Sequence, residues 1–100
     1  MESINSNSYW NDRFEIDWES NKGPEQSRFF SKITIENLPK WLIDQIKRNK
    51  LKFADWGCAQ GDGTDVWTSF IDSSRITGID FSSTAIKQAI KRYPAIRFLN

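Results

Sequence analysis

Histidine is absent from this chain, and its absence removes several kinds of chemistry. Imidazole general bases, Ser-His and Cys-His nucleophile systems and His-ligated metal sites are excluded, which leaves carboxylates, a thiol or a bound cofactor. We predict no metal site. The one cysteine, Cys58, excludes an internal disulfide and favours a reducing, cytoplasmic setting. No His or Lys adjoins Cys58 to stabilise a thiolate, so we expect it to pack rather than to act as a nucleophile.

The chain also lacks an excess of charge of either sign. Lys and Arg total 14 against 13 Asp and Glu, so no long-range field points to a nucleic acid or an anionic membrane. No apolar run approaches the ~20 residues that a membrane span needs, and the first residues lack the basic and apolar regions of a signal peptide. We therefore expect a soluble, cytoplasmic protein with neither a membrane nor a nucleic-acid partner.

Aromatic residues are plentiful, at 14% of the chain and including five tryptophans. This content favours a packed globular chain, and one hundred residues suffice for one modest hydrophobic core. Trp10 and Trp18 lie among acidic residues, whereas a base-stacking platform needs basic residues between its aromatic rings. These tryptophans therefore do not indicate a nucleic-acid partner.

The first apolar pattern in the chain has helical spacing. Trp10, Phe14 and Trp18 recur every four residues after Ser8, a candidate N-cap, which predicts an amphipathic helix over residues 9–18.

Two prolines then divide the next segment. Pro24 suits the first turn of a second helix because its missing N–H is not needed there, and that helix should end before Pro39, where a third begins. The residues predicted to be buried on these two helices are Phe29, Phe30, Ile33, Trp41, Leu42 and Ile46.

From residue 51 onward, short β-rich runs alternate with helical patterns. Strands are predicted at residues 51–56, 75–80 and 95–99. One intervening helix should cover residues 64–72, and the next should start after an N-cap at Ser82 or Ser83. The predicted inward residues of these helices are Val66, Trp67, Phe70, Ile71, Ala85, Ile86, Ala89 and Ile90.

This order, three helices followed by β-α-β-α-β, indicates an α/β protein with a parallel sheet and right-handed crossovers. We interpret residues 1–50 as a helical N-terminal cap and residues 51–100 as the start of a doubly wound sheet. A third strand with nothing after it to cover or extend it suggests an incomplete, truncated sheet.

The segment DWGCAQGDG, residues 55–63, follows the first strand. Ligands of doubly wound sheets sit beyond the carboxyl ends of the strands, where the backbone must approach them closely. Gly57, Gly61 and Gly63 suit such a turn because glycine reaches positive φ and carries no side chain. The start of the following helix adds unpaired N–H groups. An ordinary strand-to-helix turn is the alternative explanation.

Two carboxylates end the first two strands. Asp80 can accept hydrogen bonds from a pair of vicinal ribose hydroxyls, and Asp55 can accept from an ammonium group or from ligand-bound water. The alternative role for Asp80 is to cap the next helix.

Phosphate-binding patterns fail at this loop. A P-loop needs Lys then Ser or Thr after its last glycine, whereas Gly63 precedes Thr64 and Asp65. The G-x-G-x-x-G spacing is also broken, and Asp62 and Asp65 would repel a pyrophosphate. A nucleoside without phosphates, bearing an amino-acid group, fits better.

These residues resemble the first motif of the class I S-adenosylmethionine-dependent methyltransferases. DWGCAQGDG is similar to the family's acidic-x-Gly-x-Gly-x-Gly loop, with Ala59 in place of the middle glycine, and GIDFS at residues 78–82 is similar to its second-strand motif. The resemblance implies that Asp80 holds the ribose hydroxyls and that Phe81 lies against the adenine. It places the remaining loop residues along the methionine and ribose side of S-adenosylmethionine: Asp55, Gly57, Cys58, Ala59 and Gly61.

The N-terminal segment YWNDRF is also similar to segments that close over the cofactor in many family members. The resemblance makes four residues candidates for such a lid: Tyr9, Trp10, Arg13 and Arg28.

The resemblance further implies a Rossmann-like sheet of seven strands, of which this chain carries about the first three. It implies methyl transfer to a small-molecule acceptor, most of whose contacts would come from later loops. Because transfer from a sulfonium relies mainly on in-line positioning, no catalytic base is assigned. Two alternatives remain: a fragment of a nicotinamide-dependent oxidoreductase, or a non-catalytic module that binds a nucleoside or forms a homodimer.

Overall fold

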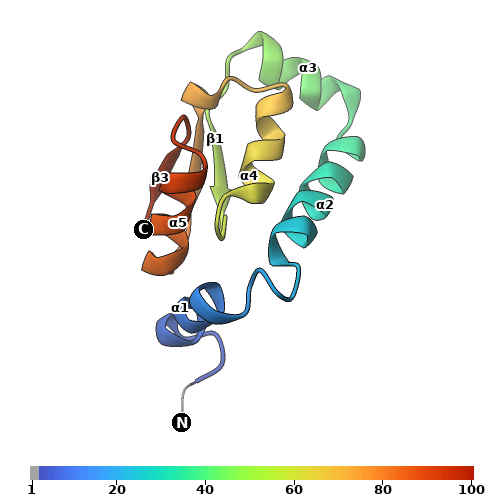
Figure 1. The fold of residues 1–100 in the computed structure, drawn as a ribbon. Coiled ribbons are helices and arrows are strands. Elements are labelled where there is room, and N and C mark those ends of the chain that lie inside the picture. The colour runs from blue at the N-terminus through green and yellow to red at the C-terminus, as the bar shows by residue number, and fades with distance from the viewer. Residues whose placement is uncertain (1–2) are drawn as a thin grey trace.

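The computed structural model describes residues 3–100 as an elongated α/β molecule (Figure 1). Three helices come first, namely α1 (Asn7–Ile16), α2 (Gly23–Glu36) and α3 (Lys40–Arg48). They precede β1 (Phe53–Trp56), α4 (Asp62–Val66), two short 3-10 helices η1 (Trp67–Ser69) and η2 (Ser73–Arg75), β2 (Ile76–Ile79), α5 (Ser83–Arg92) and β3 (Arg97–Leu99).

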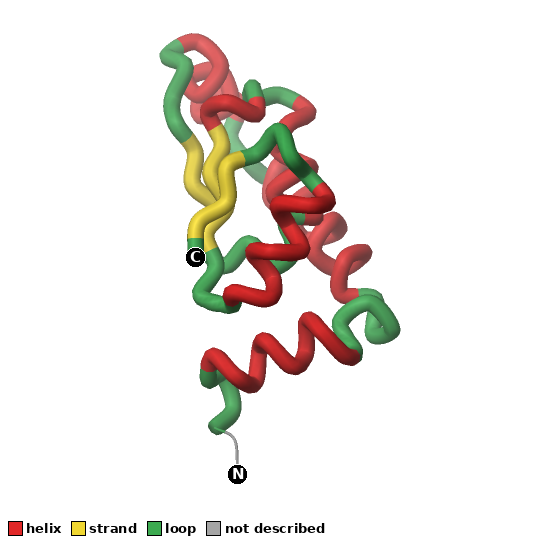
Figure 2. The backbone as a smooth tube through the Cα atoms, turned by 60° about the vertical axis from the view of Figure 1, so that its left-hand side comes forward, coloured by secondary structure: helices red, strands yellow, loops and turns green. Residues whose placement is uncertain are grey.

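The three strands form one parallel sheet in the order β1-β2-β3, which confirms the predicted parallel pairing. Phe53 pairs with Ile76, and Thr77 pairs with Arg97. The helices that cover the sheet lie on one face of it, and within residues 3–100 no helix covers its opposite face (Figure 2). Side chains therefore alternate between a buried helix-facing row and a more exposed row.

The hydrophobic core lies between this sheet and the helices. Ile71 and Ile76 are each 1% exposed, and Ala89 of α5 is fully buried. Phe98 of β3 packs where Gly78 of β2 has no side chain, since a Cβ on Gly78 would lie 2.6 Å from the Phe98 ring. The predicted packing role of Cys58 is confirmed, because this residue is 4% exposed within the core.

Helix α1 begins two residues earlier than predicted. Ser6, not Ser8, is the N-cap, and its hydroxyl accepts a hydrogen bond from the Tyr9 N–H at 3.2 Å. The helix ends at Ile16, and Trp18 lies in the following turn against Gly23. A Cβ on Gly23 would overlap the Trp18 indole, so glycine is required at this close approach.

The predicted buried face of α2 is wrong. Phe29 and Phe30 are 58% and 64% exposed, and Ile33 is 39% exposed. The helix instead approaches α4 through small residues: a Cβ on Gly63 would lie 2.7 Å from the Ser31 hydroxyl and 3.0 Å from the Ser27 carbonyl oxygen. The close approach at Gly63, together with Ile35 against the core, thus determines which face of α2 is covered.

The predicted buried face of α3 is correct in part. Ile46 is buried and Leu42 packs against the core, but Trp41 is 66% exposed, so its predicted burial is wrong. On α5, Ser82 is the N-cap as predicted, whereas Ile90 is 51% exposed rather than inward.

The single helix predicted over residues 64–72 is also wrong. Helix α4 has five residues and tightens into η1 at Trp67. The Thr68 hydroxyl donates to the Asp65 carbonyl oxygen at 2.6 Å, and Trp67 packs against Phe53 with ring centroids 4.4 Å apart. The tighter turn places Trp67 and Ile71 in the core. All three strands are shorter than predicted, as their bounds show.

A polar network joins α2, α4 and the end of α5. The Tyr93 hydroxyl donates to Asp62 at 2.5 Å and accepts from Arg28 at 2.9 Å, while Arg28 also donates to Asp65 at 2.9 Å. Arg92 donates to the same oxygen of Asp62. Asp62 is 2% exposed, so these bonds compensate a buried carboxylate.

None of the helices within residues 3–100 combines the length and the apolar character that a membrane crossing requires.

Candidate functional site

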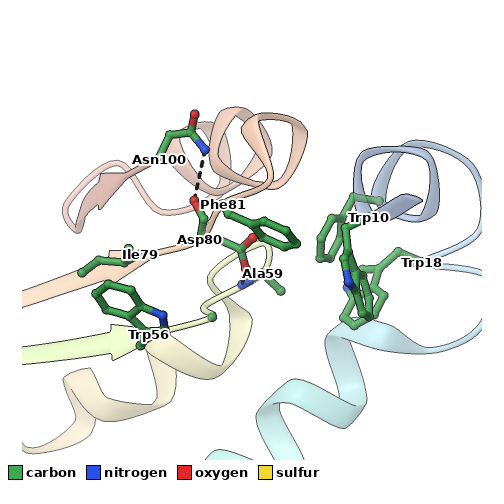
Figure 3. Close-up of a pocket in the computed structure, with 10 residues that line it drawn as sticks. Trp10, Trp18, Trp56, Ala59, Ile79, Asp80, Phe81 and Asn100 are labelled. Carbon is green, nitrogen blue, oxygen red and sulfur yellow. Dashed lines mark hydrogen bonds between the residues drawn. The ribbon is translucent and has the colours of Figure 1, made fainter. Parts of the chain in front are cut away.

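A cavity of about 580 Å³ opens at the carboxyl ends of the strands, between the sheet and α1 (Figure 3). The β1 arrow in Figure 1 points toward α1, which lies across this end of the sheet. The lining residues are Trp10, Phe14, Trp18, Trp56, Gly57, Ala59, Ile79, Asp80, Phe81 and Asn100. The position agrees with the place where ligands bind in open parallel sheets.

Asp80, directly after β2, is the acidic residue of this cavity and is 8% exposed. One carboxylate oxygen accepts from the Ala59 N–H at 2.9 Å, and the other accepts from the Ser82 N–H at 2.8 Å. Its carbonyl oxygen accepts from the Asn100 side chain at 3.1 Å. The carboxylate is thus fixed between two backbone donors, and each oxygen keeps a lone pair for a ligand hydroxyl. The predicted capping of the α5 start and a ligand-binding role are compatible.

The three loop glycines have different roles. Gly57 has φ +80°, and a Cβ there would meet nothing within 4 Å, so the backbone at the cavity is open. Gly61 has φ +88°, but a Cβ there would lie 2.7 Å from the Phe98 ring. Gly63 gives α2 its close approach. Only Gly57 of the three is in the cavity lining that the structure describes.

Ala59 adopts φ +52°, in the left-handed region that favours glycine. The residue occupies the position at which the resembled motif has its middle glycine. Its conformation aims the N–H at Asp80. Ala59 therefore has a glycine-type backbone although it carries a methyl group.

Asp55, in β1, is outside the described lining of the cavity. The Thr64 hydroxyl donates to its carboxylate at 2.6 Å. Burial raises the pKa of Asp55, the bond from Thr64 lowers it, and the charge of Asp80 raises it. Through the bond from Thr64, this carboxylate thus holds the start of α4, and it adds negative potential near the loop.

Cys58 is also outside the described lining. Burial, followed by the charges of Asp80 and Asp55, raises the pKa of its thiol to about 12. A neutral thiol in the core agrees with packing and offers no thiolate near pH 7.

Aromatic side chains form two walls of the cavity. Trp10, Phe14 and Trp18 form the α1 wall, with centroids of the Phe14 and Trp18 rings 4.8 Å apart and those of Trp10 and Phe14 5.8 Å apart. Figure 3 shows Trp10 and Trp18 facing Phe81 and Ala59 across the cavity. Phe81 is 50% exposed and Trp56 is 82% exposed, so both rings have surface available for contact.

Polar contacts hold α1 in place against α5. The Asn11 side-chain oxygen accepts from the Ser82 hydroxyl at 2.5 Å and from the Thr84 N–H at 3.3 Å. The Gln88 side chain donates to the Phe14 carbonyl oxygen at 3.2 Å. The α1 wall therefore depends on a few hydrogen bonds at the start and middle of α5.

The structure brings some of the predicted site residues together and separates others. Those that line the cavity are Gly57, Ala59, Asp80, Phe81 and Trp10. Those that lie outside its described lining are Asp55, Cys58, Gly61, Tyr9, Arg13 and Arg28. Arg28 belongs to the network with Asp65 and Tyr93, and Arg13 lies 3.7 Å from Asp17 and over the Tyr9 ring.

Sequence reasoning did not assign Phe14, Trp18, Trp56, Ile79 and Asn100 to the site. The four-residue spacing of Trp10, Phe14 and Trp18 was a usable signal, because a stripe that contains one lid candidate places its other members nearby. Trp56 directly precedes Gly57 and points away from the helices (Figure 3).

The described lining contains one carboxylate and neither Lys nor Arg. Within residues 3–100, no cluster of three or more Cys, Asp or Glu side chains is arranged to hold a metal ion. The arrangement can hold a largely apolar ligand that presents hydroxyl groups to Asp80 and a flat ring to the aromatic walls.

No protein-family model and no curated protein sequence matches this chain.

Proposed function

We propose that this protein binds S-adenosylmethionine and belongs to a methyltransferase acting on a small molecule. The observation that carries the proposal is the position of Asp80. Its carboxylate is buried, held by the Ala59 and Ser82 N–H groups, and faces the cavity beside the exposed Phe81 ring. A carboxylate after the second parallel strand suits the two hydroxyls of a ribose.

Two further cavity residues suit other parts of this ligand. Phe81 offers a flat apolar surface for an adenine, and the open space above Gly57 admits a chain close to the backbone. The bound cofactor would supply a methyl group activated by a sulfonium. The protein's part would be to bind and orient it, with Asp80 as a hydrogen-bond acceptor rather than a base. A Rossmann-like fold and a cytoplasmic location belong to the same proposal.

Isothermal titration calorimetry with S-adenosylhomocysteine tests this proposal. We expect Asp80→Ala and Phe81→Ala each to weaken binding, because one removes the ribose acceptor and the other removes the ring surface. Asp44→Ala on α3, which loses only an exposed ion pair with Lys40, is the matched control and should bind normally. Thermal melts of each variant separate loss of the site from loss of the fold.

Undiminished affinity in folded Asp80→Ala would remove Asp80 from the site. Titration with NADH distinguishes the alternative enzyme class, because a nicotinamide-dependent oxidoreductase would bind the dinucleotide and not S-adenosylhomocysteine. Asp62 and Asp65 lie at the start of α4, where they disfavour a pyrophosphate. We therefore expect no NADH binding.

A further inference from the structure

The described lining of the cavity combines several aromatic rings with a single carboxylate. Five of its ten described lining residues are aromatic, one is a carboxylate, and none is Lys or Arg. The faces of aromatic rings carry negative electrostatic potential and attract organic cations, most strongly at Trp. The lining therefore favours a ligand with a positive charge over a neutral ligand of the same shape.

The indoles of the α1 wall are placed to exert this preference. Trp10 and Trp18 face Ala59 and Phe81 across the cavity, and their ring centroids are 6.3 Å apart (Figure 3). Under the proposed function, Gly57 and Ala59 would hold the methionine side of the ligand. Trp10 and Trp18, which face Ala59, would then be the residues that meet its sulfonium charge.

The carboxylates near the cavity act in the same direction, whereas Arg13, over the Trp10 ring, opposes it. Asp80 lines the cavity and Asp55 lies near the loop, so two carboxylates contribute negative potential. The nearest cation of α1 is Arg13, whose guanidinium lies 5.8 Å from the Trp10 ring centroid. Asp17 lies 3.7 Å from that guanidinium and offsets its charge. The local field at the α1 wall is thus favourable to a ligand cation.

We propose that Trp10 and Trp18 make this site selective for charge, so that it binds the sulfonium donor more tightly than the neutral thioether product. This inference rests on the proposed function. Methyl transfer forms a bond from the acceptor's lone pair to the methyl carbon and leaves the electrons of the broken carbon–sulfur bond on sulfur. The ligand thereby loses its positive charge, and with it the attraction of the indoles. Product release is favoured, and inhibition by product is weak.

The test compares the dissociation constants of S-adenosylmethionine and S-adenosylhomocysteine by calorimetry on the full chain. We expect the sulfonium to bind about three- to tenfold more tightly, the range of cation–aromatic contacts at partly exposed sites. An analogue with an ammonium in place of the sulfonium should follow the charged ligand. Equal affinities, or tighter binding of the thioether, would overturn the inference while leaving the proposed function intact. Absence of binding by all three ligands would contradict both.

Variants then test whether the α1 wall produces this selectivity. Trp10→Leu keeps an apolar side chain on α1 but removes the ring, so the ratio of the two affinities should fall toward one. Trp10→Phe keeps a ring and should retain part of the ratio. Trp41→Leu removes an exposed indole from α3 and should leave the ratio unchanged. If Trp10→Leu does not fold, Trp10→Phe provides the test. An unchanged ratio of the two affinities in that variant would exclude Trp10 as the selective residue.

Discussion

The backbone of Ala59 combines a left-handed φ of +52° with a side chain that disfavours it. We predict that Ala59→Gly raises the free energy of unfolding by about 0.5–1 kcal/mol, because relief of the Cβ strain exceeds the added flexibility of the unfolded chain. In a domain of this size that corresponds to a melting temperature roughly 2–8 °C higher. Chemical and thermal denaturation measure the change.

Ala54→Gly is the matched control for this prediction. Ala54 is an exposed residue of β1 outside the positive-φ region, so glycine there should lower stability by about 0.5–1 kcal/mol. A decrease in stability of Ala59→Gly similar to that of the control would show that Ala59 is not strained.

The sequence predicted a site residue correctly where it also predicted the place of that residue in a strand or a turn. The end of a strand predicted Asp80, and the turn after β1 predicted Gly57 at the cavity. The same motif could not tell Gly57 from Gly61, because the side chains of Phe98 and Tyr93, distant in sequence, fill the space at Gly61. A one-dimensional motif specifies which residues bend the chain, whereas neighbours distant in sequence decide which of them remain open.

At the scale of elements, Tyr93 connects α5 to both α2 and α4. Its hydroxyl donates to buried Asp62 and accepts from Arg28. We predict that Tyr93→Phe lowers the free energy of unfolding by about 1.5–3 kcal/mol, the range for hydrogen bonds to charged groups. Urea denaturation measures the loss.

Tyr9→Phe makes the same chemical change on α1, where the Tyr9 ring packs edge-on against Trp10 and its hydroxyl forms no hydrogen bond within residues 3–100. This control should change stability by less than about 0.5 kcal/mol. Equal effects in the two variants would mean that the network at Asp62 contributes nothing to the joining of the helices.

The types of the strands and of α1, α2, α3 and α5 followed from local patterns, but the two 3-10 helices and the buried faces of the helices did not. Hydrophobic spacing correctly predicted the burial of Ala85, Ile86 and Ala89 on α5, although Ile90 is half exposed. It failed for α2, because that helix is held by small residues against Gly63 and by Arg28, leaving Phe29 and Phe30 outside. A sequence pattern reveals apolar stripes more readily than it reveals close contacts between backbones.

At the scale of the whole molecule, the cavity has one wall on α1 and the other at the ends of the strands. The α1 wall is held to α5 by hydrogen bonds from Ser82, Thr84 and Gln88. The opposite wall belongs to the sheet, whose core residues are almost fully buried. Because local opening follows contact density, α1 should open more readily than the sheet and α5.

Hydrogen exchange tests this difference and its link to the proposed function. We predict that amides of α1 exchange faster than those of α5 in the free chain. A ligand that contacts both Asp80 and the indoles of Trp10 and Trp18 adds contacts only when α1 is in place, so S-adenosylmethionine should slow exchange in α1. Helix α3 lines no part of the cavity in the described residues and is the internal control. Equal slowing in α1 and α3 would indicate general stabilisation. Slowing at the strand ends without slowing in α1 would mean that the ligand binds without the α1 wall, and the charge selectivity would then lose its physical basis.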